Sequence, residues 1–296
     1  MNVETVHTQV QRPGNTFALG SLIADAARAL AGVSATPRLD AELLLAHAAG
    51  VGRSGIVAFP ERETSAEVEA RFRALLARRL DGEPLAYIRG RKDFHAITLS
   101  VTPEVLIPRP ETECVVDAAL GLIAERSECS VLDLGTGSGA IALAIKQARP
   151  DALVTAVDAS AGAVAVARAN AASLGLDVRC LESDWFAGLG AERFDLVVCN
   201  PPYVRSGDPV FDGALRHEPR EALDGGRDGL DAIRFVLNET PAHLVSGGAL
   251  LIEHGHDQQP DIVALATEQG YRIVATRRDL GGLPRFVVLQ ALESEP

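Results

Sequence analysis

Residues 131–139 are Val131-Leu132-Asp133-Leu134-Gly135-Thr136-Gly137-Ser138-Gly139, an apolar run followed by three alternate glycines. The apolar run predicts a buried strand, and the glycines allow a tight bend where a ligand can approach the backbone without meeting Cβ atoms. The spacing is GxGxG, which differs from the GxGxxG of dinucleotide sites, and no P-loop lysine follows. A strand that enters a glycine turn and then a helix predicts the first unit of an α/β sheet.

Strand and helix patterns alternate from this stretch to the end of the chain. Strands are predicted at residues 130–134, 153–158, 176–181, 194–199, 248–253, 271–277 and 285–291. Helices are predicted between most of them, at residues 138–148, 160–173, 228–240 and 257–268. This alternation predicts a doubly wound, Rossmann-like α/β domain with seven strands.

Acidic and aromatic residues at the ends of the next two strands indicate a nucleoside ligand. Asp158 ends the second predicted strand beside the glycine turn, where its carboxylate can accept hydrogen bonds from both ribose hydroxyls. After the third strand, Asp184 can accept from an adenine amino group and Trp185 can lie beside the ring; a capped helix start with a core tryptophan is the alternative. An acid placed to bind ribose, after glycines whose spacing does not suit a pyrophosphate, favours S-adenosylmethionine over NAD as the ligand.

The tetrapeptide Asn200-Pro201-Pro202-Tyr203 follows the predicted strand at residues 194–199. The Asn200 side-chain oxygen and the Pro201 carbonyl can accept the two N–H bonds of a planar NH2 group, while Tyr203 covers its face and the prolines fix the loop. A plain strand-terminating turn is the alternative. Beside the glycine turn, this motif predicts in-line transfer of a methyl group to nitrogen, with Asn200, Pro201 and Tyr203 as catalytic residues and no ionised base.

Residues 17–90 show three helical patterns rich in alanine, leucine and arginine. The second pattern begins near Pro37 and is expected to turn Leu39 inward. Thr64 and Glu67 have the spacing of a capping box at the start of the third helix. These helices predict a small bundle without chemistry of its own, which indicates a role in holding a partner.

A short hairpin is predicted between the bundle and the sheet. Its strands are expected at residues 94–99 and 104–107, and Pro110 is placed to open a helix that ends near Arg126. The expected domains are a helical bundle at residues 1–93, a hairpin linker at residues 94–108 and the α/β domain at residues 109–296.

The net charge of the chain limits the kinds of partner that it is expected to bind. The 296-residue chain has 28 basic and 40 acidic side chains, so its net charge is −12. Counterion release from phosphates drives much of the affinity for nucleic acids, so this acidic balance argues against direct nucleic-acid binding. One stripe of basic residues is a candidate exception, with a solvated helix face as the alternative. It consists of Arg71, Arg73, Arg78 and Arg79.

The chain carries no pattern for membrane insertion or export. No apolar run approaches the roughly 18 residues that span a bilayer. Residues 1–12 are polar and lack the apolar stretch of a signal peptide, so a cytoplasmic protein is expected. The four cysteines form no CxxC pair, and His254-Gly255-His256 lacks a third clustered ligand, so we predict reduced thiols and no metal.

Six segments together resemble the protein-glutamine N5-methyltransferases that modify peptide chain release factors, the HemK/PrmC type. They are Leu106-Ile107-Pro108-Arg109-Pro110-Glu111-Thr112-Glu113, Asp133-Leu134-Gly135-Thr136-Gly137-Ser138-Gly139-Ala140-Ile141-Ala142, Ser183-Asp184-Trp185, Asn200-Pro201-Pro202-Tyr203, Glu218-Pro219 and Glu253-His254-Gly255. The resemblance covers nearly the whole chain and the combination of motifs is specific, although each motif occurs in other methyltransferases.

The resemblance implies a class I methyltransferase domain that methylates the glutamine in the Gly-Gly-Gln tip of a class 1 release factor, tuning translation termination. The cofactor-binding residues expected from the motifs and the resemblance together are Gly135, Thr136, Gly137, Ser138, Gly139, Asp158, Asp184, Trp185 and Asn200. Asn200, Pro201, Pro202 and Tyr203 are implied to hold the glutamine amide. The bundle is implied to grip the release factor, residues 204–227 to cover the substrate, and a monomer is expected.

Three alternatives remain open from the sequence. A sister methyltransferase acting on a glutamine of a ribosomal protein would share the motif and the cofactor site. A DNA adenine-N6 methyltransferase uses a similar motif on a flipped base, but would need a basic groove or a target-recognition region. A binding module without turnover would have no reason to keep both the glycine turn and the Asn-Pro-Pro-Tyr motif.

Overall fold

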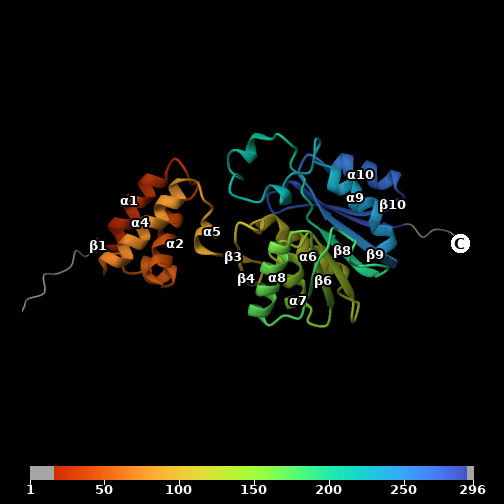
Figure 1. Ribbon diagram of the computed structural model, residues 1–296, viewed down its shortest axis with the longest axis horizontal. Helices are drawn as coiled ribbons and strands as arrows, with labels where there is room; N and C mark the ends of the chain where they lie inside the picture. The colour runs from red at the N-terminus through yellow and green to blue at the C-terminus, as the bar shows by residue number, and fades with distance from the viewer. Residues whose placement is uncertain (1–16, 292–296) are drawn as a thin grey trace, which may run out of the picture. The chain divides into compact units, whose positions relative to one another are not determined.

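The computed structural model describes residues 17–291 and divides the chain into two compact units, residues 1–89 and 90–296 (Figure 1). The first unit has one hydrophobic core, and the second has two, one on each face of its sheet. The polar segment at residues 1–12, on which the expectation of no signal peptide depends, lies outside the described residues. Within residues 17–291, no helix combines the length and the apolar composition needed to cross a membrane.

The first unit is a helical bundle. Its helices are α1 (Leu19–Leu30), α2 (Pro37–Ala49), α3 (Arg53–Val57), α4 (Ala66–Leu80) and α5 (Leu85–Arg89). The two-residue strands β1 (Phe17–Ala18) and β2 (Glu63–Thr64) pair in antiparallel orientation. Leu30, Leu44 and Phe72 are fully buried at the centre of this unit. The three long helices match the sequence patterns, whereas α3, α5 and the strand pair are too short to show a period.

Two details predicted for the bundle are wrong. Leu39 is 38% exposed, because α2 turns Ala41, Leu44 and Leu45 into the core and Leu39 lies on the opposite face. The cap of α4 is Ser65, whose hydroxyl accepts from the Val68 N–H at 3.3 Å, because the preceding threonine belongs to β2. A serine and a threonine in succession offer two possible caps, and strand pairing selects the second.

The basic stripe on α4 is neutralised by acidic partners. The pairs are Arg71–Glu67, Arg73–Glu69, Arg78–Glu83 and Arg79–Asp40. The Arg79–Asp40 pair, at 2.8 Å, joins α4 to α2 and is largely shielded from water. The stripe therefore contributes to the fold of the bundle and presents no uncompensated basic face to a nucleic acid.

A hairpin opens the second unit, but not with the predicted strands. Its strands are β3 (Arg91–Phe94) and β4 (Ile97–Ser100), so the turn falls where a continuous strand was expected, and residues 104–107 form no strand. Phe94, Ile97 and Leu99 are buried in the core of this unit. The hairpin is thus part of the α/β unit, and the expected linker at residues 94–108 is wrong in its boundaries.

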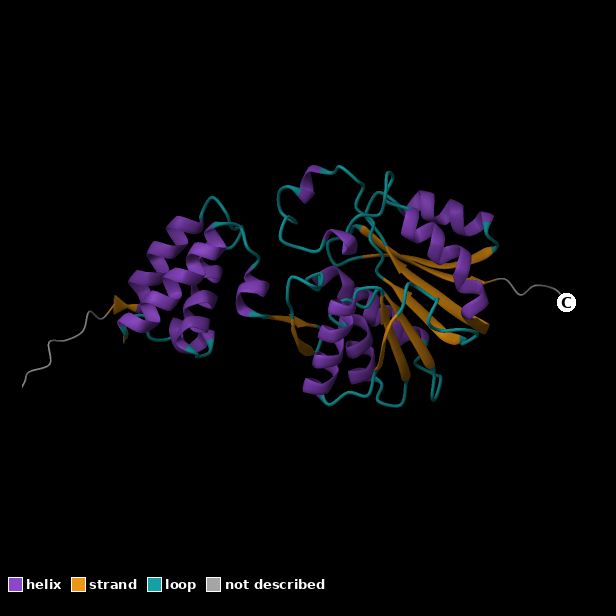
Figure 2. Ribbon diagram, viewed as in Figure 1, coloured by secondary structure: helices purple, strands orange, loops and turns teal. Residues whose placement is uncertain are grey.

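The α/β unit contains a seven-stranded sheet with the order β10-β11-β9-β8-β5-β6-β7 (Figure 2). The strands are β5 (Ser130–Leu134), β6 (Leu153–Asp158), β7 (Arg179–Glu182), β8 (Phe194–Cys199), β9 (Leu244–Glu253), β10 (Tyr271–Arg278) and β11 (Pro284–Ala291). Neighbours from β7 to β9 pair in parallel, whereas β11 runs antiparallel to both β9 and β10. The predicted seven-stranded α/β fold is confirmed, although β7 begins three residues later than expected.

Helices cover both faces of this sheet (Figure 1). One face carries α6 (Glu113–Leu122), α7 (Ala140–Ala148) and α8 (Ala161–Leu174), and the other carries α9 (Asp231–Glu239) and α10 (Gln259–Glu268). Short 3₁₀ turns are η1 (Pro110–Thr112), η2 (Pro209–Phe211), η3 (Arg220–Ala222) and η4 (Thr240–His243). The helix predicted to run from Pro110 to Arg126 is therefore η1 followed by a shorter α6.

Strand register brings three distant residues to one edge of the sheet. In the parallel ladders, Leu134 is the partner of Cys199, and Cys199 is the partner of Ile252. The residues that follow these partners are Gly135, Asn200 and Glu253. They lie side by side at the carboxyl edge, where the chain order reverses between β5 and β8 and where α/β sheets bind their ligands.

Candidate active site

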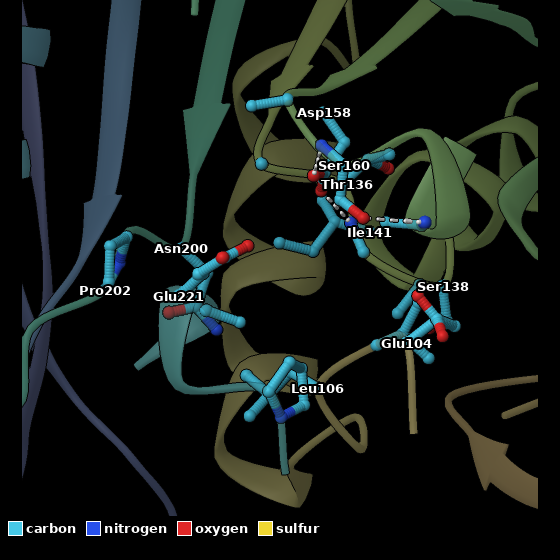
Figure 3. Close-up of a pocket in the computed structure, with 18 of the residues that line it drawn as sticks. Glu104, Leu106, Thr136, Ser138, Ile141, Asp158, Ser160, Asn200, Pro202 and Glu221 are labelled. Carbon is cyan, nitrogen blue, oxygen red and sulfur yellow. Dashed lines mark hydrogen bonds between the residues drawn. The ribbon is translucent and has the colours of Figure 1, made fainter. Parts of the chain in front are cut away.

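A cavity of about 410 Å³ opens at this edge of the sheet (Figure 3). Its walls come from the glycine turn, the ends of β6 and β8, the segment before α6 and the turn η3. Asn200 and Glu221 lie on one side, across from Thr136 and Asp158. Glycine, carboxylate, amide and aromatic groups thus surround a space of the size that holds a small ligand.

The glycine turn keeps its backbone open to the cavity. Gly135 and Gly137 have φ of 71° and 55°, and a Cβ atom on either would meet nothing within 4 Å. A buried acid, Asp133, supports the turn by accepting from the Thr136 hydroxyl at 2.6 Å and the Ala142 N–H at 3.1 Å. Burial raises the pKa of Asp133 to about 6, against the effect of these two hydrogen bonds. The sequence placed this residue in a strand without indicating its supporting role.

Asp158 is fixed at the wall of the cavity by backbone donors. Its two carboxylate oxygens accept from the Gly137 and Ser160 N–H groups, each at 2.9 Å. Burial raises the pKa of this carboxyl group, and the two hydrogen bonds oppose the shift. A carboxylate oxygen can accept more than one hydrogen bond, so Asp158 can still receive hydroxyl groups from a ligand.

Trp185 also lines the cavity, in a backbone conformation that local contacts hold. Its φ is 48°, unusual for a residue with a side chain. The Ser183 hydroxyl donates to the Trp185 carbonyl and accepts from the Gly188 N–H, each at 2.8 Å. The indole packs against Phe235 of α9, with ring centroids 5.9 Å apart. Asp184, expected at the same ligand, is exposed and is not part of the cavity wall.

The Asn-Pro-Pro-Tyr motif divides between the cavity and the interior. Asn200 and Pro202 line the cavity, whereas Pro201 is buried behind them. The Tyr203 hydroxyl donates to Glu253 Oε1 at 3.4 Å, and the tyrosine is not part of the cavity wall. Burial raises the pKa of Tyr203 to about 12. The structure therefore places the amide where it was predicted, but turns the ring predicted to cover a substrate toward Glu253.

Two buried glutamates support the site, although the sequence patterns predicted no individual role for either. Glu218 accepts from the Ile107 N–H at 3.1 Å and from Arg109 at 2.6 Å, and these bonds tie the 204–227 segment to the wall before α6. Glu253 is 1% exposed, and burial raises its pKa to about 7, although the nearby Thr112 and Tyr203 hydroxyls oppose the shift. An acid at the end of an apolar strand was the available signal for Glu253.

The end of the 204–227 segment packs directly against the motif. Val204 N–H donates to the Leu223 carbonyl, and Gly225 N–H donates to the Val204 carbonyl, each at 2.8 Å. A Cβ atom on Gly225 would lie 2.7 Å from the Pro202 carbonyl oxygen and 2.9 Å from Tyr203 Cα. Glycine is therefore required for this segment to lie against the backbone that positions Asn200.

His254 and His256 face different surroundings. His254 is buried, its Nδ1 lies 2.8 Å from the Gly255 carbonyl oxygen, and burial lowers its pKa. His256 is exposed beside Asp257. Among residues 17–291, no three His, Cys, Asp or Glu side chains gather as a metal site would require, and the four cysteines are free.

Comparisons with known proteins agree with this geometry. The order of the seven strands and the glycine turn after β5 define a class I methyltransferase fold. A 16S rRNA methyltransferase from T. thermophilus, solved with AdoMet and guanosine, shares the fold with a TM-score of 0.50 and 20% identity, over 68% of this chain and 50% of that one. The family models that match are the PrmC N-terminal domain at residues 21–90 and the methyltransferase small domain at residues 117–217.

The chain belongs to the family of release factor glutamine methyltransferases. The protein of that name from Bordetella pertussis is 46% identical over 252 residues, which cover 84% of this chain and 93% of the relative. The Escherichia coli K12 protein of the same name is 44% identical over 257 residues, which cover 86% of this chain and 92% of the relative. The resemblance identified from the motifs is confirmed.

The contact between Gly225 and the motif gives a first prediction. Gly225→Ala should lower kcat for methyl transfer about tenfold or more, because the new Cβ displaces the Pro202 and Tyr203 backbone and with it Asn200. Gly213→Ala is the matched control in the same segment, since its Cβ would meet nothing nearer than 3.5 Å. Steady-state kinetics measure both variants, and equal kcat values would contradict the positioning role.

Proposed function

We propose that this chain transfers a methyl group from S-adenosylmethionine to the side-chain amide nitrogen of a glutamine in a peptide chain release factor. The observation that carries the proposal is the register of β5 and β8, which sets the glycine turn and Asn200 beside each other on one cavity. Membership of the family supports the choice of a release factor as the acceptor.

The residues present fit S-adenosylmethionine. Gly135 and Gly137 leave the backbone open where a ligand would lie, and Asp158 would accept hydrogen bonds from the ribose hydroxyls. Trp185 would lie beside the adenine ring, supported by Phe235. The bound cofactor would supply the methyl group on a positively charged sulfur. The chain's own residues would bind it, orient it and limit the access of water.

Asn200 would hold the acceptor amide from the cavity wall, with the carbonyl of the buried Pro201 as the predicted second acceptor. Two oxygens that accept its two N–H bonds would aim the nitrogen lone pair at the methyl group and favour the positive charge that develops on nitrogen. Pro202 forms part of the cavity wall, and the two prolines limit the freedom of the loop. No ionised base is needed during transfer, since the amide proton can leave afterwards. Tyr203 would support the motif from the protein interior, through its hydrogen bond to Glu253.

Within the release factor, the proposed acceptor is the glutamine of the Gly-Gly-Gln tip of a class 1 factor. The bundle would bind the body of that protein. The match of residues 21–90 to the PrmC N-terminal domain supports a family-specific role for the bundle. The net charge of −12 and the neutralised arginines of α4 disfavour direct contact with nucleic acid. This substrate implies a cytoplasmic enzyme, and a monomer stays a prediction that light scattering would check.

Labelled S-adenosylmethionine tests the acceptor. The chain is incubated with a class 1 release factor, the same factor with its tip glutamine changed to alanine, a ribosomal protein mixture, and duplex DNA. We expect label in the unmodified release factor alone. Label in the alanine variant or in DNA would overturn the proposal, and label confined to ribosomal proteins would assign the activity to the sister class of substrate.

Removing the bundle tests its role. A chain of residues 90–296 retains both cores of the second unit. Its KM for the whole release factor should rise about tenfold or more, while kcat/KM for a short peptide with the acceptor glutamine changes less than about threefold. Equal losses on the two substrates would contradict a gripping role for the bundle.

A further inference from the structure

We propose that Glu221 makes the cavity bind S-adenosylmethionine in preference to its neutral-sulfur product, S-adenosylhomocysteine, by presenting an uncompensated negative charge to the charged sulfur. Glu221 belongs to the turn η3 and lines the cavity on the same side as Asn200 (Figure 3). The inference rests on the proposed function, because it takes S-adenosylmethionine as the methyl donor.

Four charged side chains of the described residues line the cavity, and three of them have groups that offset their charge. The four are Glu104, Arg109, Asp158 and Glu221. Arg109 is paired with the buried Glu218 at 2.6 Å, and Asp158 accepts from two backbone N–H groups at 2.9 Å. The Glu104 carboxylate lies against the first turn of α8, since a Cβ atom on Gly162 would collide with it. The positive end of a helix favours a carboxylate at that place.

Glu221 is the charged group without such compensation. Within residues 17–291, its side chain forms no hydrogen bond and no ion pair. The basic residue beside it, Arg220, pairs with Asp224 at 3.2 Å, and its guanidinium lies over the ring of Phe211, 4.5 Å from the centroid. The cavity therefore carries an excess of negative charge, and this excess is located at Glu221.

The fold holds Glu221 close to the place where the methyl group must be transferred. Leu223, directly after η3, accepts from the Val204 N–H at 2.8 Å, so η3 is tied to the end of the motif that begins at Asn200. The methyl group and the acceptor nitrogen must come within about 3–3.5 Å of each other before transfer. The sulfur that carries the methyl group would therefore lie on the Asn200 side of the cavity, which is also the side of Glu221.

The reaction removes the positive charge that Glu221 would attract. The lone pair of the amide nitrogen forms the new N–CH3 bond, the electrons of the C–S bond pass to sulfur, and a proton of the nitrogen leaves to water. S-adenosylmethionine thus becomes a neutral thioether that keeps its ammonium and carboxylate groups. A carboxylate that faced the ammonium would bind both molecules alike, so preference between them requires a charge near the sulfur. Loss of this attraction would favour release of the product.

Binding titrations of the full chain with S-adenosylmethionine and with S-adenosylhomocysteine test the inference. Both can be followed by the fluorescence of Trp185, the one tryptophan of the sequence, which lines the cavity. Because Glu221 is exposed and partly screened by water, Glu221→Gln should raise the Kd of S-adenosylmethionine about three- to tenfold, and change the Kd of S-adenosylhomocysteine less than about twofold. Glu221→Asp keeps the charge and should hold the ratio of the two Kd values within about twofold of wild type.

Asp212→Asn is the matched control, since it removes the same charge from an exposed acid of the same segment that is not part of the cavity wall. Both of its Kd values should stay within about twofold of wild type. Raising the ionic strength from about 0.05 M to about 0.5 M should reduce the preference of the wild-type chain and leave that of Glu221→Gln nearly unchanged.

Three results would each overturn the inference: equal weakening of both ligands by Glu221→Gln, an unchanged ratio in that variant, or the same change of ratio in Asp212→Asn. A wild-type chain that binds both ligands but labels no release factor would instead refute the proposed acceptor, and the titrations would still decide the role of Glu221.

Discussion

The site depends on the parallel register of β5, β8 and β9. Because Leu134, Cys199 and Ile252 are partners, the residues that follow them meet at one edge: a glycine turn, an amide and a buried acid. Side chains of β8 alternate between the two cores, with Leu196 and Val198 on one face and Val197 and Cys199 on the other. A slip of one residue would exchange these faces, so burial on both sides fixes the register and with it the geometry of the site.

Three buried acids lie next to the cavity, and each forms hydrogen bonds that hold a neighbouring segment of the chain in place. Asp133 supports the glycine turn, Glu218 fastens the 204–227 segment, and Glu253 accepts a hydrogen bond from the Tyr203 hydroxyl at the end of the motif. Burying a carboxyl group is unfavourable unless hydrogen bonds compensate, so these positions constrain the chain strongly. This arrangement gives a site whose shape is set before any ligand binds, as methyl transfer to a weak nucleophile requires.

Sequence patterns predicted the sheet, the glycine turn, Asp158 and Asn200, because each depends on local periodicity or on the end of a buried strand. Predictions from these patterns failed where contacts between residues far apart in the sequence determine the local structure. The hairpin turn at His95 has a positive φ although no glycine occupies that position, and Asp184 is exposed and is not part of the cavity wall that its neighbour Trp185 lines. Thr112 lies 88 residues from Asn200 along the chain, so spacing could not connect them.

The central claim is that Asn200 acts on the acceptor amide during transfer, beyond any contact with the cofactor. Asn200→Ala, assayed at saturating S-adenosylmethionine, separates the two roles. The account predicts that kcat falls about 100-fold or more while cofactor Kd changes less than about threefold. A Kd raised in proportion to the loss of kcat/KM, with kcat preserved at saturation, would show that Asn200 only binds the cofactor and would contradict the account.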